Sequence, residues 1–308
     1  KSLLRWNCDK EDGVWFDRDN MSILMYACAS ANINVVTEVL QLLPTTDMKT
    51  RTEWLEHRVR RKGFVNFGIP GGTNALFASM AWGTPDIVEL LLENGANASI
   101  KDRNGVDPFM YACYYGRNAN IKFWLERFKN WEIHRGNRAT GANALTLALS
   151  QGPDKLETAR ILMEAGVDFS RCASSGVTNL MVACSNEDSD PDVVDFLLST
   201  CDPNIQARPR GSRWKAIRYA AKMLTQLRLV KRGGLAAHIA NGLGTTALHY
   251  ASRRGDVEIV ESLLSCGADP KVKNSMGLDA ASIATAFPEL RGLLEKRERR
   301  MKLRGTRK

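Results

Sequence analysis

Apolar residues along the chain return in a fixed order, which is clearest around Leu248. A Gly lies four residues before Leu248, an Ala lies three residues after it, and the apolar pairs Ile259–Val260 and Leu263–Leu264 follow. Apolar positions with this spacing are typical of two amphipathic helices joined by a turn. The segment therefore predicts one helix–turn–helix repeat.

The same order returns at six other anchor positions. They are Leu24, Leu76, Phe109, Leu145, Leu180 and Ala281. With Leu248 included, the spacings between anchors are 52, 33, 36, 35, 68 and 33 residues. A period of about 33 residues is typical of a solenoid, in which each repeat buries its apolar face against the next. The predicted fold is an all-α helix–turn–helix solenoid of seven repeats with short hairpin tips.

Two positions in each repeat are expected to pack at short range. The third residue after the anchor is small in all seven repeats: Ala27, Ser79, Ala112, Ala148, Ala183, Ala251 and Ala284. A small residue there lets two helices cross closely. Cys28, Cys113 and Cys184 follow this position directly and are predicted to be packing residues. The Gly or Asn four residues before each anchor suits a hairpin turn with positive φ.

Three segments resemble the ankyrin repeat: TTALH, RRGDVEIVESLLSCGADP and NGVDPFMYACYYG. The resemblance covers about Asp17 to Leu294. It implies a protein that binds another protein without catalysing a reaction. In the family, side chains at the positions of Thr246 and His249 form a hydrogen bond between repeats, and among the seven repeats only this one keeps both residues.

Two anchor spacings are too long for one repeat and predict inserts. The spacing of 52 contains an insert at about 45–63 that is predicted to form one helix. The spacing of 68 contains an insert at about 208–240, in which RWKAIRYAAKMLTQLRLV (213–230) is predicted to form a basic amphipathic helix. A repeat that has lost the common order is the alternative, and the charge contrast favours an insert. The predicted domains are an N-terminal flank (1–16), the solenoid (17–294) and a basic C-terminal tail (295–308).

The family resemblance also implies where a protein partner would bind. In ankyrin repeats the partner usually meets the hairpin tips and the exposed end of the first helix, five and six residues after the anchor. Those positions hold Trp82, Tyr114 and Tyr115, which are expected to form the apolar centre of the interface, and Arg253 and Arg254, which would attract an acidic segment. Tip residues predicted as rim contacts are Arg18, Met21, Arg103 and Asn104. The alternative is that Trp82 and Tyr115 stack on each other or lie beneath the first insert.

The net charge of +9 is spread unevenly over the chain. Residues 203–255 carry 11 Lys or Arg and no Asp or Glu, and residues 295–308 carry 8 basic and 2 acidic residues. Lys215, Arg218 and Lys222 lie on one stripe of the predicted insert helix, and together with Arg213 they make a candidate basic surface. Such a surface can bind RNA, DNA or an anionic membrane. The alternative is that it only improves solubility, and the tail is also a candidate targeting signal.

Other motifs do not predict a cofactor or a reaction. IQARPRGSRWK (205–215) is similar to a calmodulin-binding motif, but Pro209 interrupts the helix that the motif needs, so calmodulin is not an expected partner. GLGTTA (242–247) spells a dinucleotide fingerprint, yet it falls on a predicted hairpin turn and has no βαβ unit around it. The four His are scattered and no nucleophile or metal motif is present. We therefore expect no cofactor and no enzyme activity.

Cysteine usage and hydropathy bear on the compartment. Seven Cys without a CxxC pair indicate a reducing compartment. No apolar run approaches the roughly 20 residues that a membrane-spanning helix needs. The expected setting is intracellular, in the cytoplasm or the nucleus, and the expected state is a monomer. The regulatory part of a larger protein is an alternative prediction.

Overall fold

The computed structural model describes residues 7–8, 15–16, 21–42, 48–59, 72–138, 140–186, 188, 190–206, 216, 219 and 244–305. The chain divides into two compact parts, which we call the N-terminal unit (1–139 with 151–165) and the C-terminal unit (140–150 with 166–308). Helices dominate both units, and the described residues contain seven helix pairs. The predicted all-α architecture of seven repeats is therefore confirmed.

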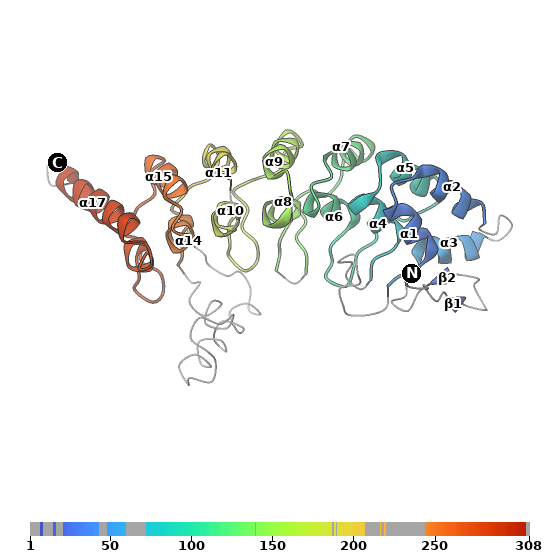
Figure 1. Cartoon of the computed structure of the whole chain (residues 1–308), viewed down its shortest axis with the longest axis horizontal. Coiled ribbons are helices and arrows are strands. Elements are labelled where there is room, and N and C mark those ends of the chain that lie inside the picture. Colours follow the sequence, from blue (N-terminus) through green and yellow to red (C-terminus); the bar gives the residue numbers. More distant parts are fainter. Residues whose placement is uncertain are drawn as a thin grey trace. The chain divides into compact units, whose positions relative to one another are not determined.

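The N-terminal unit contains two short strands and eight helices among its described residues. These are β1 (Asn7–Cys8), β2 (Trp15–Phe16), α1 (Ile23–Ala29), α2 (Ile33–Gln41), α3 (Met48–Glu56), α4 (Ala75–Trp82), α5 (Pro85–Glu93), α6 (Pro108–Tyr114), α7 (Asn118–Arg127) and α9 (Lys155–Glu164). The two strands pair antiparallel. Helices α1, α4 and α6 pack side by side in one row, and α2, α5, α7 and α9 form a second row against them (Figure 1).

The C-terminal unit repeats this two-row arrangement. Its described helices are α8 (Ala144–Gln151, whose last residue belongs to the other unit), α10 (Asn179–Ser185), α11 (Pro191–Leu198), α14 (Ala247–Arg254), α15 (Val257–Ser265), α16 (Ala280–Ile283) and α17 (Pro288–Gly305). Helix α14 packs between α10 and α16 in the first row. In the second row α11 packs against α15, while α17 packs on α16.

Most of the helices begin at a polar side chain that caps the first turn. These side chains accept a hydrogen bond from a backbone amide two or three residues further on: Ser22, Asn32, Asn74, Asp107, Asp154, Thr178, Asp190, Asp256 and Asp279. Each cap satisfies an amide that the helix itself leaves unpaired. Short helices of seven to ten residues are marginal alone, so caps and packing between repeats hold them together.

The small residues of the repeat lie where the two rows of helices meet. All seven, Ala27, Ser79, Ala112, Ala148, Ala183, Ala251 and Ala284, are at most 4% exposed. Cys28, Cys113 and Cys184 are fully buried free thiols. Burial raises the pKa of the Cys28 thiol far above its ordinary value, which keeps it protonated. Both predictions, close packing at the small position and packing roles for these cysteines, are confirmed.

Hairpin tips connect successive repeats and turn on a glycine with positive φ. At one tip the Gly105 amide donates to the Asp102 carbonyl oxygen (3.1 Å) and the Val106 amide donates to Asp102 Oδ1 (2.8 Å). The Gly277 amide donates to the Asn274 carbonyl oxygen (2.9 Å) in the equivalent turn near the C-terminus. The φ angles of Gly105 and Gly277 are 78° and 76°. The predicted positive φ is therefore confirmed at these tips.

Neighbouring tips touch through these glycines. A Cβ placed on Gly72 would lie 3.0 Å from the backbone nitrogen of Arg103, and one placed on Gly141 would lie 2.5 Å from the backbone nitrogen of Ser174. A Cβ on Gly277, by contrast, would meet no described atom within 4 Å. The tips therefore stack backbone against backbone, and Gly277 lies at a tip without this contact.

His249 links two repeats of the C-terminal unit. The Thr246 amide donates to His249 Nδ1 (3.1 Å), so the imidazole carries its proton on Nε2, which donates to the Leu278 carbonyl oxygen (3.2 Å). His249 is buried, and burial lowers the pKa of its imidazole. The hydrogen bond between repeats that the family resemblance implied is therefore present.

This buried imidazole predicts a loss of stability in weak acid. The unfolded chain binds a proton at His249 below a pH of about 6.5, whereas the folded chain resists it because its pKa is lowered. The free energy of unfolding should therefore decrease as the pH falls from about 6.5 toward the folded-state pKa. Urea unfolding at pH 7.5 and 5.5 measures this decrease. A His249→Gln variant should show a smaller decrease, and an equal decrease in both proteins would contradict the assignment.

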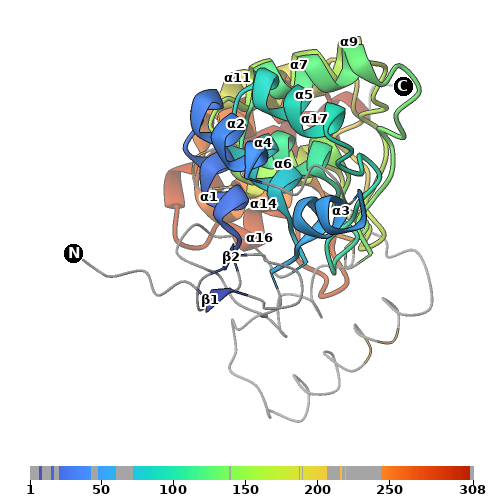
Figure 2. The same cartoon turned by 90° about the vertical axis from the view of Figure 1, so that its right-hand side faces the viewer.

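The two predicted inserts and the tail have different outcomes. The first insert forms α3, which packs beside α4 (Figure 2), with Trp54 and Leu55 buried. The predicted insert at about 208–240, with its helix at 213–230, lies almost wholly outside the described residues. Helix α17 continues to Gly305, so most of the predicted basic tail (295–308) is helical. The predicted domain boundaries remain predictions.

Candidate protein-interaction surface

Three aromatic side chains gather where α4 and α6 end. The ring centroids of Trp82 and Tyr115 are 5.2 Å apart, and those of Tyr114 and Tyr115 are 5.0 Å apart with the rings edge to face. All three residues are partly exposed. We call Trp82, Tyr114 and Tyr115 the aromatic cluster. Their predicted meeting on adjacent repeats of the N-terminal unit is observed.

Two buried aromatic residues support the aromatic cluster from below. Tyr111 packs edge to face on Phe77, with ring centroids 4.8 Å apart, and its ring lies 6.2 Å from that of Tyr115. Burial raises the pKa of Tyr115 and, more strongly, that of Tyr111, so both phenols stay neutral at physiological pH. The cluster is thus a partly exposed surface held in place by buried rings, and it is amphipathic because Trp and Tyr each combine an apolar ring with a polar group.

A buried amide holds the end of α4 in place beneath the cluster. Asn120 on α7 is 1% exposed, and its Nδ2 lies 3.1 to 3.2 Å from three carbonyl oxygens, those of Ser79, Met80 and Gly83. These carbonyl groups lie at the C-terminus of a helix, where they have few partners within the helix. Asn120 therefore connects two repeats and positions the backbone that carries Trp82.

One part of the alternative prediction, that Trp82 and Tyr115 stack on each other, is also observed. The segment of the first insert forms hydrogen bonds with the turn after α5, where Glu56 accepts from the Asn97 amide (3.1 Å) and Arg58 donates to the Lys101 carbonyl oxygen (3.2 Å). Stacking and partial exposure occur together, so the cluster is both a packing element and a surface.

The predicted arginines divide into exposed and partly buried residues. Arg253 is exposed, and its guanidinium lies 5.4 Å from the centre of the Tyr250 ring. The side chain of Arg254 is 18% exposed and faces Asp256, with Nη2 3.5 Å from Oδ2. The expectation that both arginines project toward a partner is therefore corrected for Arg254, because the nearby carboxylate draws its side chain into the fold.

The predicted rim residues also differ from one another. Arg103 and Asn104 are exposed at a hairpin tip, in agreement with their predicted place. Met21 is fully buried, so its prediction as a rim contact is wrong. It directly precedes the cap residue Ser22, and an apolar residue at that position commonly packs on the first turns of the helix. Arg18 lies outside the described residues.

The candidate basic surface cannot be placed in the structure. Its four residues, Arg213, Lys215, Arg218 and Lys222, all lie outside the described residues. Their role in binding nucleic acid or an anionic membrane stays a prediction that depends on charge alone.

Family comparison agrees with the geometry of the repeats. The family described as "Ankyrin repeats (3 copies)" matches residues 52–135, 109–207 and 180–274, which together span 52–274 of the 308 residues. The chain belongs to the ankyrin repeat family. The fold class and the resemblance noted for TTALH and the related segments are thereby confirmed.

Similar proteins carry ankyrin repeats within longer chains. The ankyrin repeat and KH domain-containing protein mask-1 of Caenorhabditis elegans is 29% identical over 239 aligned residues, a match that covers 66% of this chain and 9% of that protein. The probable E3 ubiquitin-protein ligase XBOS32 of Oryza sativa subsp. japonica is 27% identical over 222 residues, covering 72% of this chain and 36% of that protein. The chain therefore spans far less than two thirds of either relative.

Solved ankyrin repeat domains share the fold. The ankyrin repeat domain of Bcl-3 superposes with a TM-score of 0.58 and 21% identity, covering 90% of this chain and 100% of that chain. The ankyrin repeat domain of human ASB11 gives the same TM-score and identity, covering 90% of this chain and 98% of that chain. At this identity the likeness shows the fold alone.

Sequence reasoning missed the base of the aromatic cluster. Tyr111 and Tyr115 are four residues apart, a spacing that places them on the same face of a helix, so this pair could have been found from the segment PFMYACYYG. Phe77 could not have been found in this way, because its contact with Tyr111 joins two repeats.

In the described part of the chain, no three His, Cys, Asp or Glu side chains form a possible metal site. Over the same residues, no helix is long and apolar enough to cross a membrane.

Proposed function

We propose that this ankyrin repeat chain is a non-catalytic interaction module that binds a protein partner through the aromatic cluster and the adjacent hairpin tips. The observation that carries the proposal is the aromatic cluster itself, Trp82, Tyr114 and Tyr115, partly exposed and fixed on buried rings. Trp and Tyr are the residues that most often dominate binding energy at protein interfaces. Membership of the ankyrin family supports a protein as the partner.

The fixed geometry of the cluster favours binding. Tyr115 stacks on three neighbouring rings, those of Trp82, Tyr111 and Tyr114, so these side chains lose little conformational freedom when a partner arrives. Arg103 and Asn104 are exposed at the hairpin tip that precedes α6, and such polar side chains suit the polar rim of an interface. The buried free cysteines support an intracellular setting for this module.

A single truncation at the edge of the cluster tests the proposal. Tyr114→Ala removes a ring at the outer edge of the cluster, and we expect partner affinity to fall about 30-fold while the thermal midpoint changes by only a few degrees. Partners are first identified by pull-down and mass spectrometry and then titrated against the purified chain. Met163→Ala is the matched control, because Met163 is also an exposed apolar residue but lies in the second row of helices.

The outcomes separate this function from binding through the basic insert. Equal loss of affinity in Tyr114→Ala and Met163→Ala, or no loss in either, contradicts the role of the cluster. A bound set that disappears after nuclease treatment or at raised salt supports nucleic-acid binding through residues 203–255 instead, because such binding weakens steeply with salt. Truncating all three aromatic residues together is a poorer test. Tyr115 also packs on the buried Tyr111, so its removal would change stability as well as binding.

A further inference from the structure

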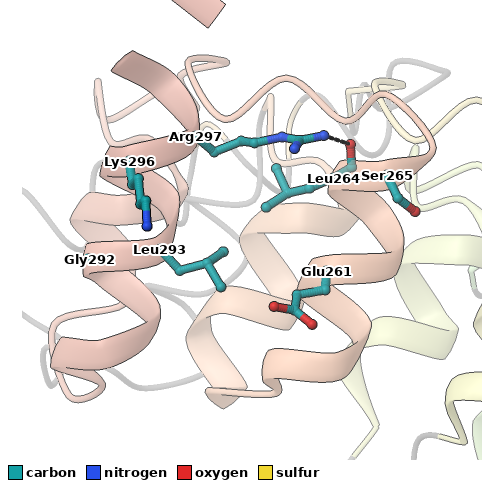
Figure 3. Close-up of a pocket in the computed structure, with 7 residues that line it drawn as sticks. All are labelled: Glu261, Leu264, Ser265, Gly292, Leu293, Lys296 and Arg297. Atoms are coloured by element: carbon teal, nitrogen blue, oxygen red, sulfur yellow. Dashed lines mark hydrogen bonds between the residues drawn. The ribbon is translucent and has the colours of Figure 1, made fainter. Parts of the chain in front are cut away.

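A groove of about 520 Å³ lies between α15 and α17 in the C-terminal unit (Figure 3). Leu264 of α15 and Leu293 of α17 form its apolar floor. Glu261 lies on the α15 side, and Lys296 and Arg297 lie on the α17 side. The volume is within the range of pockets that bind small ligands or a few residues of a peptide.

Gly292 leaves this groove open. It lies inside α17, where glycine destabilises a helix relative to alanine. A Cβ placed on Gly292 would meet no described atom within 4 Å, and its φ is not in the positive region, so neither a close contact nor the backbone requires glycine. Gly292 is one of the residues that line the groove, and the absence of a side chain there leaves this part of the lining open.

The charges around the groove favour an acidic occupant. Lys296 forms no ion pair among the described side chains, whereas Arg291 and Arg299 on the same helix are paired with Glu295 at 2.9 and 3.8 Å. Arg297 extends across the top of the groove and donates from Nη2 to the Leu264 carbonyl oxygen (3.3 Å), which leaves its other N–H groups available (Figure 3). The two basic residues that line the groove, Lys296 and Arg297, both belong to α17, so the α17 side of the groove is positively charged.

We propose that this groove binds a peptide segment of a protein partner in which an apolar side chain is adjacent to a carboxylate. The apolar side chain enters between Leu264 and Leu293, and the carboxylate meets Lys296 and the free N–H groups of Arg297. The Glu261 carboxylate lies on the α15 side of the groove, across from Lys296 and Arg297, where it can accept a hydrogen bond from a peptide N–H. This second binding site is separate from the aromatic cluster and does not depend on it.

The test compares peptides selected on the full chain and on a variant with a filled groove. A library of random 12-residue peptides displayed on phage is selected in parallel on the wild-type chain and on Gly292→Leu. Gly292 lines the groove and a Cβ there meets no neighbour within 4 Å, so we expect leucine to narrow the groove. Leucine also improves helix propensity, so the thermal midpoint should be equal or higher. We expect a set of peptides enriched only on the wild-type chain, with Asp or Glu next to Leu, Ile or Phe.

Fluorescence anisotropy with a labelled peptide from that set completes the test. Gly292→Leu and Lys296→Glu should each weaken its binding at least tenfold, while Lys271→Glu, an equal charge change at another exposed residue of this unit, should leave it unchanged. Tyr114→Ala should also leave it unchanged, which separates this site from the proposed function. The proposal is overturned if no such set appears, if the set is basic or uncharged, or if Lys296→Glu and Lys271→Glu act alike. Self-association of the wild-type chain that Gly292→Leu abolishes would identify a second copy as the occupant and would also overturn it.

Discussion

An Asn120→Asp variant should lose about 3 to 5 kcal/mol of stability at neutral pH, a large part of the 5–15 kcal/mol typical of folded domains. The change is nearly isosteric, but it replaces the amide that binds three carbonyl oxygens at the end of α4 with a carboxylate that would face them. Because Asn120 is 1% exposed, water cannot compensate the new charge. Thermal and urea unfolding of the purified chain measure the loss.

The pH dependence of this variant distinguishes a buried charge from a general packing defect. Burial should raise the pKa of the introduced carboxyl above its unfolded value, so the destabilisation is smallest in acid, below a pH of about 4, and grows as the pH rises through the folded-state pKa. Asn34→Asp is the matched control. It makes the same change in the same unit, at an exposed position in the first turn of α2, where a negative charge is mildly favourable. Equal losses in the two variants, or a loss independent of pH, would contradict this account.

Gly141→Ala should be more harmful than Gly277→Ala, although both residues occupy the same position of a hairpin tip. Their φ angles are 74° and 76°, so both substitutions incur a left-handed strain of about 1–2 kcal/mol. A Cβ on Gly141 would also lie 2.5 Å from the backbone nitrogen of Ser174, which must move, at a further cost of about 1–3 kcal/mol. A Cβ on Gly277 has no such neighbour among the described atoms.

The difference between these two variants is the informative measurement. Urea unfolding of both proteins under the same conditions gives the free energy that the contact between tips adds to the strain. A difference near zero would mean that the tips of the C-terminal unit do not press on each other in solution. Because both glycines belong to the same unit, effects on the other unit cannot produce the difference.

The packing of this fold could be predicted from spacing because every repeat has to satisfy the same contacts. The small residue after each anchor and the buried cysteine beside it follow from how closely two helices cross, and both are visible in a single repeat such as Ala112 and Cys113. Trp82, Tyr114 and Tyr115 are predicted from the resemblance to ankyrin repeats, which implies that a partner meets the end of the first helix in each repeat.

Features that depend on one particular neighbour could not be predicted in this way. Arg253 and Arg254 occupy neighbouring positions, five and six residues after the anchor, yet only Arg254 lies close enough to Asp256 to be drawn inward. The repeat pattern ends near Leu294, but α17 continues to Gly305, and ion pairs four residues apart, Arg291–Glu295 and Glu295–Arg299, support this continuation. The groove beside Gly292 has no signal in the repeat pattern, since it depends on the space between two helices.

Contact between hairpin tips through glycine has a consequence for how this chain can change its specificity. A Cβ on Gly72 would lie 3.0 Å from the backbone nitrogen of Arg103 and 3.1 Å from its Cγ, whereas Asn104 is exposed to solvent and is not among these nearest atoms. Substitution of Asn104 can therefore alter recognition without altering the distance between repeats. An inserted or deleted residue in a tip, however, would disturb two repeats at once. Variation at the tips is thus tolerated in residue type but constrained in length.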